Sequence, residues 1–394
     1  MAYKLVSNVR DSVSGILTGI NLNNVQNLNG AFERSARELS TKIYIPEVSA
    51  KTAITLYDGV TDYISPTDIF GSGLVDFRPQ GISRDAIDFV TKQPIAVFDR
   101  TKALLENGYH LTFEFVKGVG RVRIVSSRPL PKIELDPMTA ITGWTAGGSA
   151  SGITLDETVF WQSPASFRFL LTGASVGTIT KTISSQDLTS YVGVGVVFLA
   201  IRTPSAANLT SIELRIGSSA ANYYSVTVTV AFLGAFTANE WILVAFDLAT
   251  ATTVGTPVVT AITYAQVRVT HAATLTNFYV GQLFISLPSP HDMIYSSAAF
   301  FQASGANPSQ TITATSDSVL LNDAALVIYE YECANTIAGQ QGGTLASGLI
   351  ATIDGKLNGK RARNGMVVQL GLYDIYRGNN PSQELRQISN YLDD

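Results

Sequence analysis

A long stretch that is nearly free of charge is the feature that most constrains this chain. Only eleven charged residues lie in the 148 positions from Ala140 to Leu287, whereas the other 246 positions hold 47. Thr, Ser, Ala, Gly and Val take their place, and the β-branched Thr and Val suit a pleated sheet better than a helix. With 46 % hydrophobic and 15 % charged residues overall, the chain can bury a core, which argues against disorder.

The hydrophobic pattern within this stretch predicts about eight strands. Apolar and polar residues alternate in several segments, so that Ile212, Leu214 and Ile216 face one way while Glu213 and Arg215 face the other. Clusters of Ser, Asn, Gly and Pro separate the segments at intervals typical of a β-sandwich. The predicted strands are 166–171, 177–183, 194–201, 211–216, 223–232, 241–247, 265–270 and 277–287. This number favours an all-β jelly roll, which we place at residues 136–289.

The two flanks are richer in charge and predict an α+β domain of helices and β-hairpins. The predicted helices are 1–17, 30–42, 99–107, 322–338, 345–357, 365–376 and 382–392. One hairpin is predicted from 53–57 and 61–65 across the Asp58-Gly59 turn, and another from 109–116 and 121–126. The segments 74–77 and 292–301 are expected to be extended. Because neither flank alone holds much core, we predict one domain built from residues 1–135 and 290–394, into which the sandwich is inserted.

The sequence offers little that could perform catalysis. His110, His271 and His291 lie far apart on different predicted elements, and no nucleophile elbow, phosphate loop, zinc motif or dinucleotide fingerprint occurs. The acidic pair of the sandwich, Asp156-Glu157, would point to opposite faces of a strand, which disfavours the paired carboxylates of a glycosidase. We therefore predict a protein that is not an enzyme and has no catalytic residue, cofactor or metal site. A polysaccharide hydrolase acting through Asp156 or Glu157 is the least favoured alternative.

Charge, hydropathy and cysteine content exclude further classes. A net charge of −4 gives no sign of a basic face for nucleic-acid phosphates. No segment reaches the roughly 18 to 20 apolar residues of a membrane helix, and the N-terminus lacks a signal-peptide core. We therefore predict no membrane insertion, and a protein kept in the cytoplasm or in something assembled there. The single cysteine, Cys333, cannot form an internal disulfide and is expected to be a buried thiol on a helix.

Aromatic residues of the sandwich are the remaining candidates for a binding site. Trp and Tyr combine an apolar ring with a polar group, which suits stacking on sugar rings. Trp144, Tyr223 and Tyr224 are considered as glycan contacts, since one of the two adjacent tyrosines must face outward. Sealing of the domain boundary is the alternative role for Trp144. Trp161 and Trp241 could stack in the same way, although Trp241 opens an apolar run that favours the core.

Short motifs in both flanks resemble virion proteins of tailed bacteriophages. Residues 58–69 (Asp-Gly-Val-Thr-Asp-Tyr-Ile-Ser-Pro-Thr-Asp-Ile) and 75–80 (Val-Asp-Phe-Arg-Pro-Gln) are similar to the N-terminal part of such proteins, and residues 293–302 (Met-Ile-Tyr-Ser-Ser-Ala-Ala-Phe-Phe-Gln) to their C-terminal part. The middle is similar to the jelly rolls of carbohydrate-binding modules in residues 161–169 and 241–248. The acidic pair that such modules usually carry before the last strand is replaced here by Val280-Gly-Gln. The α+β body resembles head-to-tail adaptors of the tail tubular A type.

This resemblance implies a structural protein in the neck or tail of a virion. The chain would be one subunit of a homo-oligomeric ring, often twelvefold, that connects the portal protein to the tail or nozzle proteins. Genome DNA would pass through its channel without sequence-specific binding. A ring subunit needs interfaces that close under rotation rather than an active site. The alternative is a receptor- or glycan-binding collar, tail or capsid-decoration protein that uses the jelly roll.

The C-terminal segment is the predicted interface of such a ring, because aromatic residues and arginine are enriched at protein interfaces. An amphipathic terminal helix packed on its own domain would have the same pattern. The predicted interface residues are Tyr373, Tyr376, Arg377, Leu385, Arg386 and Tyr391.

Overall fold

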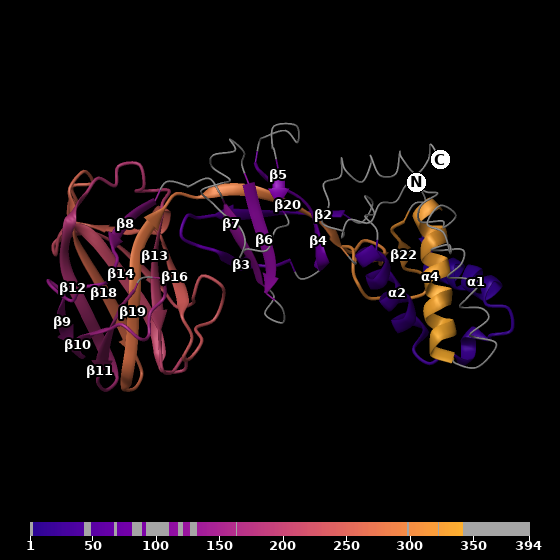
Figure 1. Ribbon diagram of the computed structural model, residues 1–394, viewed down its shortest axis with the longest axis horizontal. Coiled ribbons are helices and arrows are strands. Elements are labelled where there is room, and N and C mark those ends of the chain that lie inside the picture. Colours follow the sequence, from indigo (N-terminus) through magenta and orange to yellow (C-terminus); the bar gives the residue numbers. More distant parts are fainter. Residues whose placement is uncertain are drawn as a thin grey trace.

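The computed structural model describes residues 3–42, 49–66, 69–80, 89–91, 110–116, 121–126, 132–162, 164–297, 299–321 and 323–341. Within these ranges the chain is mostly β-structure, with three α-helices. The molecule is elongated, with a β-sandwich at one end, small sheets in the middle and the helices at the other end (Figure 1). The predicted helices 99–107, 345–357, 365–376 and 382–392 lie outside the described residues, as do all six predicted interface residues.

All eight strands predicted for the charge-poor stretch are confirmed. They are β11 (Ser166–Leu171), β12 (Ser175–Gln186), β13 (Val196–Arg202), β14 (Leu209–Ser219), β15 (Asn222–Val228), β16 (Ile242–Asp247), β18 (Ile262–His271) and β19 (Leu275–Ser286). Four further strands were not predicted: β8 (Lys132–Asp136), β9 (Thr145–Gly148), β10 (Ala150–Asp156) and β17 (Thr252–Val254).

These strands form the two sheets of the sandwich. One sheet has the order β10-β11-β19-β13-β16, with β8 also paired to β19, and we call it the proximal sheet because it lies toward the middle of the molecule. The other has the order β17-β15-β14-β18-β12-β9 and is called the distal sheet. Apolar side chains from both sheets meet in one core, to which β14 contributes Ile212, Leu214 and Ile216. The alternation predicted for β14 is thereby confirmed, and Glu213 and Arg215 lie on the other face.

The middle of the molecule consists of two small sheets. One has the order β2 (Ser49–Leu56), β20 (Ser289–Ser297), β4 (Ile69–Pro79), and the other β3 (Asp62–Ile64), β7 (Arg121–Ser126), β6 (His110–Val116), β5 (Phe89–Thr91). The hairpin predicted at 109–126 is confirmed as the antiparallel pair β6–β7. The hairpin predicted at 53–65 is wrong. Its turn at Asp58-Gly59 exists, but it joins β2, which pairs with β20, to β3, which pairs with β7.

A second apolar core joins these middle sheets to the proximal sheet. Strand β13 is buried on both faces, so Val196, Phe198 and Ala200 project away from the sandwich core. The Phe198 ring packs against Phe232 and Phe284, with centroid distances of 5.4 Å to each. We call this cluster the junction core; it comprises Leu56, Val60, Tyr63, Val122, Ile124, Val196, Phe198, Ala200, Leu243, Phe284, Met293 and Tyr295. The part of the proximal sheet formed by β13, β16 and β19 is therefore covered by the middle of the molecule.

The helical end is built from both flanks of the sequence. It contains α1 (Val6–Ile16), α2 (Leu28–Lys42), α4 (Asp323–Gln341), the 3-10 turn η1 (Leu22–Asn24) and a small sheet of β1 (Lys4–Leu5), β22 (Ser318–Val319) and β21 (Phe301–Gln302). Helices were predicted at all three positions. Apolar residues of the two flanks share one core, across which the Tyr329 hydroxyl donates to the Phe32 carbonyl at 3.0 Å. None of the helices in the described residues is long and apolar enough to cross a membrane.

Cys333 lies in this helical core, as predicted. Its side chain is fully buried on α4, and burial raises the pKa of its thiol far above the ordinary value. Because the thiolate is the reactive form of cysteine, this thiol is inert at neutral pH.

Candidate functional site

Trp144, a predicted glycan contact, lies in the interior of the sandwich. Its side chain is only 7 % exposed and packs edge-to-face on Phe167 with ring centroids 5.6 Å apart. The Lys181 ammonium lies 5.8 Å from the ring centroid and is ion-paired to Asp136 at 2.6 Å. Because a glycan cannot reach a ring enclosed in this way, the structure corrects the prediction. The alternative role at the domain boundary is also wrong, since Trp144 belongs to the sandwich core and not to the junction core.

The acidic pair Asp156-Glu157 forms a turn at the end of β10. Asp156 Oδ1 accepts hydrogen bonds from the Thr158 hydroxyl at 2.7 Å and from the backbone N–H groups of Thr158 and Val159 at 2.9 and 3.0 Å. The Thr158 bonds are the main reason that the pKa of Asp156 is lowered. Glu157 is exposed. This arrangement stabilises a surface turn and places no second carboxylate beside Asp156.

The histidines are likewise separate from one another. A 2.7 Å hydrogen bond joins His271 Nε2 to the Ser149 hydroxyl, and His271 Nδ1 lies 2.9 Å from the Ala273 carbonyl oxygen. His291 is buried on β20, in a different sheet, and His110 is the first residue of β6. Among the described residues, no group of three His, Cys, Asp or Glu side chains could hold a metal ion.

Tyr223 and Tyr224 point to opposite sides of the distal sheet, as their alternation predicted. Tyr224 packs against the sandwich core, whereas Tyr223 lies on the other face beside Tyr264, with ring centroids 6.4 Å apart. The strand register explains this pair, because Gly217 of β14 is directly opposite both Tyr223 of β15 and Tyr264 of β18. A Cβ atom on Gly217 would lie only 2.1 Å from the Asn222 carbonyl oxygen and 2.7 Å from Tyr223 Cβ. Glycine at this position therefore allows the two rings to meet.

A network of ion pairs continues the same face. The Arg215 guanidinium lies over the Tyr223 ring, 4.8 Å from its centroid. Glu213 accepts hydrogen bonds from Arg215 Nε at 2.5 Å and from Arg268 Nη1 at 2.6 Å, and the Ser225 hydroxyl donates to it at 3.2 Å. Glu213 thus holds both guanidinium groups in fixed orientations.

Amide and hydroxyl groups complete the surface. Gln266 donates from Nε2 to the Thr180 hydroxyl at 2.9 Å, and further threonines line the same face along β12, β15 and β18. Burial is the largest cause of the raised pKa of Tyr264, so its hydroxyl stays protonated at neutral pH and can donate a hydrogen bond. We call this surface the tyrosine platform; it consists of Glu213, Arg215, Tyr223, Tyr264, Gln266 and Arg268.

Most of the tyrosine platform was missed by sequence reasoning. The alternation in 211–216 placed Glu213 and Arg215 on one face, but no local signal showed that Arg268 and Tyr264 would be their neighbours. Those contacts depend on the pairing of β14 with β18, which are separated by more than 40 residues of chain. The alternating pattern of β18 could have placed Tyr264, Gln266 and Arg268 on one face, but not beside β14.

Comparison with known proteins gives similarity at the level of structure only. The sequence matches no protein family and no curated protein. One similar structure is a family 11 carbohydrate-binding module from Clostridium thermocellum in complex with a β-1,3-1,4-mixed-linked tetrasaccharide, at 10 % identity and a TM-score of 0.30, covering 40 % of this chain and 96 % of that one. A family 30 carbohydrate-binding module of a cellulosomal cellulase from Clostridium thermocellum has 15 % identity and a TM-score of 0.30, covering 40 % and 97 %. A xylan-binding domain of family 22 has 14 % identity and a TM-score of 0.25, covering 39 % and 93 %. At these values the likeness does not by itself indicate a ligand.

Proposed function

We propose that this protein binds a glycan on the tyrosine platform and does not cleave it. The observation that carries the proposal is the pair of rings, Tyr223 and Tyr264, beside an ion-paired polar network on the sandwich face that the described part of the chain leaves uncovered. A sugar ring presents an apolar C–H face together with neighbouring hydroxyl groups. The platform offers an aromatic surface for the C–H face of the sugar, and hydrogen-bond donors and acceptors for its hydroxyl groups.

The polar network is already ordered without a ligand. Glu213 fixes Arg215 and Arg268, and Arg215 is also stacked on Tyr223. Side chains that are already held in place lose less conformational entropy when a ligand binds, which favours affinity. The same contacts disfavour hydrolysis, because Glu213 is committed to two arginines and has no second carboxylate beside it on the platform.

The proposal is tested by a glycan array probed with the full chain and with three variants. Tyr223→Ala and Tyr264→Ala should each lower binding about fivefold or more, because stacking of a sugar on one ring contributes on the order of 1 kcal/mol. Tyr3→Ala removes an exposed tyrosine (42 % exposed) far from the platform and is the matched control. If all three variants bind the array as well as the parent chain does, the platform is not the glycan site.

We also infer, from the resemblance of the flanks to bacteriophage virion proteins, that the glycan-binding sandwich belongs to a virion component. The shared core of α1, α2 and α4 at the end opposite the sandwich favours an anchoring role for the flanks, since it leaves the tyrosine platform free. Electron micrographs of the purified protein distinguish the two forms of this inference. A ring with a central channel would support the head-to-tail adaptor, whereas glycan binding by a species without such a ring would support a collar, tail or decoration protein.

A further inference from the structure

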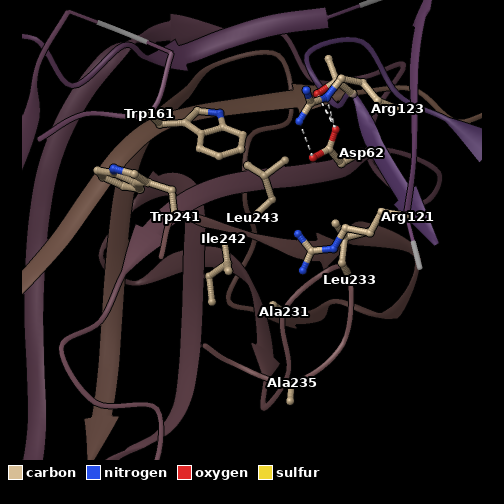
Figure 2. A pocket seen from close by; sticks show the side chains of 11 residues that line it. Asp62, Arg121, Arg123, Trp161, Ala231, Leu233, Ala235, Trp241, Ile242 and Leu243 are labelled. Atoms are coloured by element: carbon tan, nitrogen blue, oxygen red, sulfur yellow. Dashed lines mark hydrogen bonds and ion pairs between the residues drawn. The ribbon is translucent and has the colours of Figure 1, made fainter. Parts of the chain in front are cut away.

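A cleft of about 150 Å³ lies where the proximal sheet meets strands β3 and β7 (Figure 2). Trp161 and Trp241 line one side of it, Leu243 lies between the two sides, and the polar residues Asp62, Arg121 and Arg123 line the other. The cleft is separate from the tyrosine platform, because it lies on the other sheet of the sandwich. The sequence pattern placed Trp241 in the core; the structure instead leaves it half-buried at this cleft.

The two tryptophans are held in place over Gly281 of β19. A Cβ atom on Gly281 would lie 3.4 Å from Trp241 Cζ3 and 3.5 Å from Trp161 Cβ, so both tryptophans lie close to this glycine. Trp241 also packs edge-to-face on Tyr279, with ring centroids 6.3 Å apart. Gly281 of β19 therefore lies beside an aromatic wall formed by Trp161, Trp241 and Tyr279.

The opposite side carries one positive charge, that of Arg121, which no group among the described residues balances. Arg123 is bound to Asp62 through two hydrogen bonds, of 2.7 and 3.2 Å. The side chain of Arg121, two residues earlier on β7, has no ion pair or hydrogen bond with any of the described residues. Figure 2 shows its guanidinium group turned toward the Ile242 and Leu243 side of the cleft. An anionic group in the cleft would supply the partner that Arg121 lacks.

We propose that this cleft binds one six-membered sugar ring that carries a carboxylate, a hexuronate. A guanidinium group and a carboxylate match in geometry and form paired, charge-assisted hydrogen bonds, so the carboxylate lies on Arg121. The indoles of Trp161 and Trp241 receive the C–H face of the ring. A cavity of about 150 Å³ accepts a six-membered ring such as benzene. Because the cleft is partly open, the substituents of a sugar ring need not lie within that volume.

Asp62 favours a sugar over an aromatic acid as the occupant. A carboxylate has about four acceptor positions; Arg123 occupies two of those on Asp62, and the Thr61 hydroxyl occupies a third at 3.3 Å. One position is left for a ligand hydroxyl. A pyranose ring supplies such a hydroxyl next to its apolar face, whereas a simple aromatic carboxylate does not.

The test is calorimetric titration of the full chain with sodium D-glucuronate, D-glucose, benzoate and a glucuronate-containing oligosaccharide. Glucuronate should bind and glucose should not, because only the former carries the carboxylate. Arg121→Gln should weaken glucuronate binding at least about tenfold, the usual size of a lost hydrogen bond to a charged group. Arg34→Gln is the matched control, since it removes the same charge from an exposed arginine on α2 and should bind glucuronate as the parent chain does.

The other results of the titrations show whether the ligand is a free sugar acid or part of a polymer, and whether the cleft binds a hexuronate at all. Binding of the free monosaccharide indicates a free acid or chain end, and binding of the oligosaccharide alone indicates a residue within a polymer; both support the proposal. Equal binding of glucose and glucuronate, stronger binding of benzoate, or unchanged binding by Arg121→Gln would overturn it. Quenching of tryptophan fluorescence by glucuronate, reduced in Trp241→Phe, gives a second readout. Tyr223→Ala should leave glucuronate binding unchanged, so this site and the tyrosine platform can fail independently.

Discussion

The two outward faces of the sandwich differ in chemistry and in what covers them. On the proximal sheet, β13 buries six of its seven residues, because its second face joins the junction core. On the distal sheet, β14 alternates between buried and half-buried residues, and its second face carries Glu213 and Arg215. A continuous apolar run is typical of a strand covered on both sides, and alternation of a strand covered on one side. The comparison teaches that the sandwich is bound to the rest of the chain through one sheet, whereas the described residues leave the outer face of the other sheet uncovered.

The largest effect is expected on the covered face. Phe198→Ala should lower the free energy of unfolding by about 3–5 kcal/mol, because it leaves a cavity in the junction core. Phe198 is 0 % exposed and contacts Tyr57, Phe232 and Phe284. Urea unfolding followed by circular dichroism measures the loss. Tyr223→Ala on the open face is the contrast and should lose only about 1 kcal/mol, because it removes one ring contact and one cation–π contact at a half-buried position. Equal losses in the two variants would contradict the difference between the faces.

A smaller loss is expected from crowding the open face at Gly217. Gly217→Ala should destabilise the protein by about 1–3 kcal/mol, because the new Cβ atom overlaps the backbone of β15. It should also abolish glycan binding by moving Tyr223. Gly15→Ala on α1 is the control, since nothing lies within 4 Å of its Cβ position; it should be neutral or stabilising by up to about 1 kcal/mol. A Gly217→Ala protein that keeps full glycan binding would show that the ring pair does not depend on this glycine.

The free energy of unfolding should fall gradually as the pH is lowered, because His291 is buried on the covered side. Burial lowers the pKa of the His291 imidazole on β20, against the opposing effect of Asp292. As the pH falls below about 6.5, the ordinary histidine pKa, the unfolded chain takes up a proton that the folded chain does not, so stability is lost down to the folded pKa. Urea midpoints at pH 7.5, 6.5 and 5.5 measure this loss, which His291→Gln should reduce. An unchanged pH dependence in His291→Gln would assign the acid sensitivity to other groups.

The smallest effect on folding is expected from the ion pairs of the open face. Glu213→Gln should cost no more than about 1 kcal/mol, because partly exposed ion pairs contribute little to stability. Glycan binding should nevertheless fall, since Arg215 and Arg268 lose the group that orients them. Unfolding and glycan-array measurements on the same preparation separate the two effects. If Glu213→Gln greatly lowered the free energy of unfolding but left glycan binding unchanged, Glu213 would have a structural role and not the predicted binding role.

Local patterns in the sequence predicted elements well and pairings poorly. Composition, alternation in several segments and the intervening turn clusters located all eight strands. Alternation also placed Glu213 and Arg215 on one face and one of Tyr223 and Tyr224 outward, because those signals lie within a few residues. The Asp58-Gly59 turn led to the wrong prediction of a hairpin. In the structure β2 pairs with β20, more than 230 residues away, and no pattern near residue 58 indicates that pairing. Trp144 was misplaced for a related reason: an isolated tryptophan in a Gly-rich segment gives no periodicity that would reveal its burial.

Both candidate sites combine residues that lie far apart in the sequence and on different strands. The tyrosine platform combines strands that only the register of β14 and β18 brings together. The cleft combines Trp161 and Trp241 of the sandwich with Arg121 of β7, across the junction of two sheets. No sequence spacing encodes such a contact between separate sheets, so the residues could be suspected singly but not as a group.

Strand β20 is expected to resist a force that pulls along its length. After Leu287 and Pro288, β19 of the sandwich continues as β20, which is paired on one side with β2 and on the other with β4. Hydrogen bonds of an antiparallel ladder lie across the strands, so a pull along β20 strains many of them in shear at once instead of peeling them apart singly. A force that pulls the sandwich away from the helical end would therefore load this strand along its length.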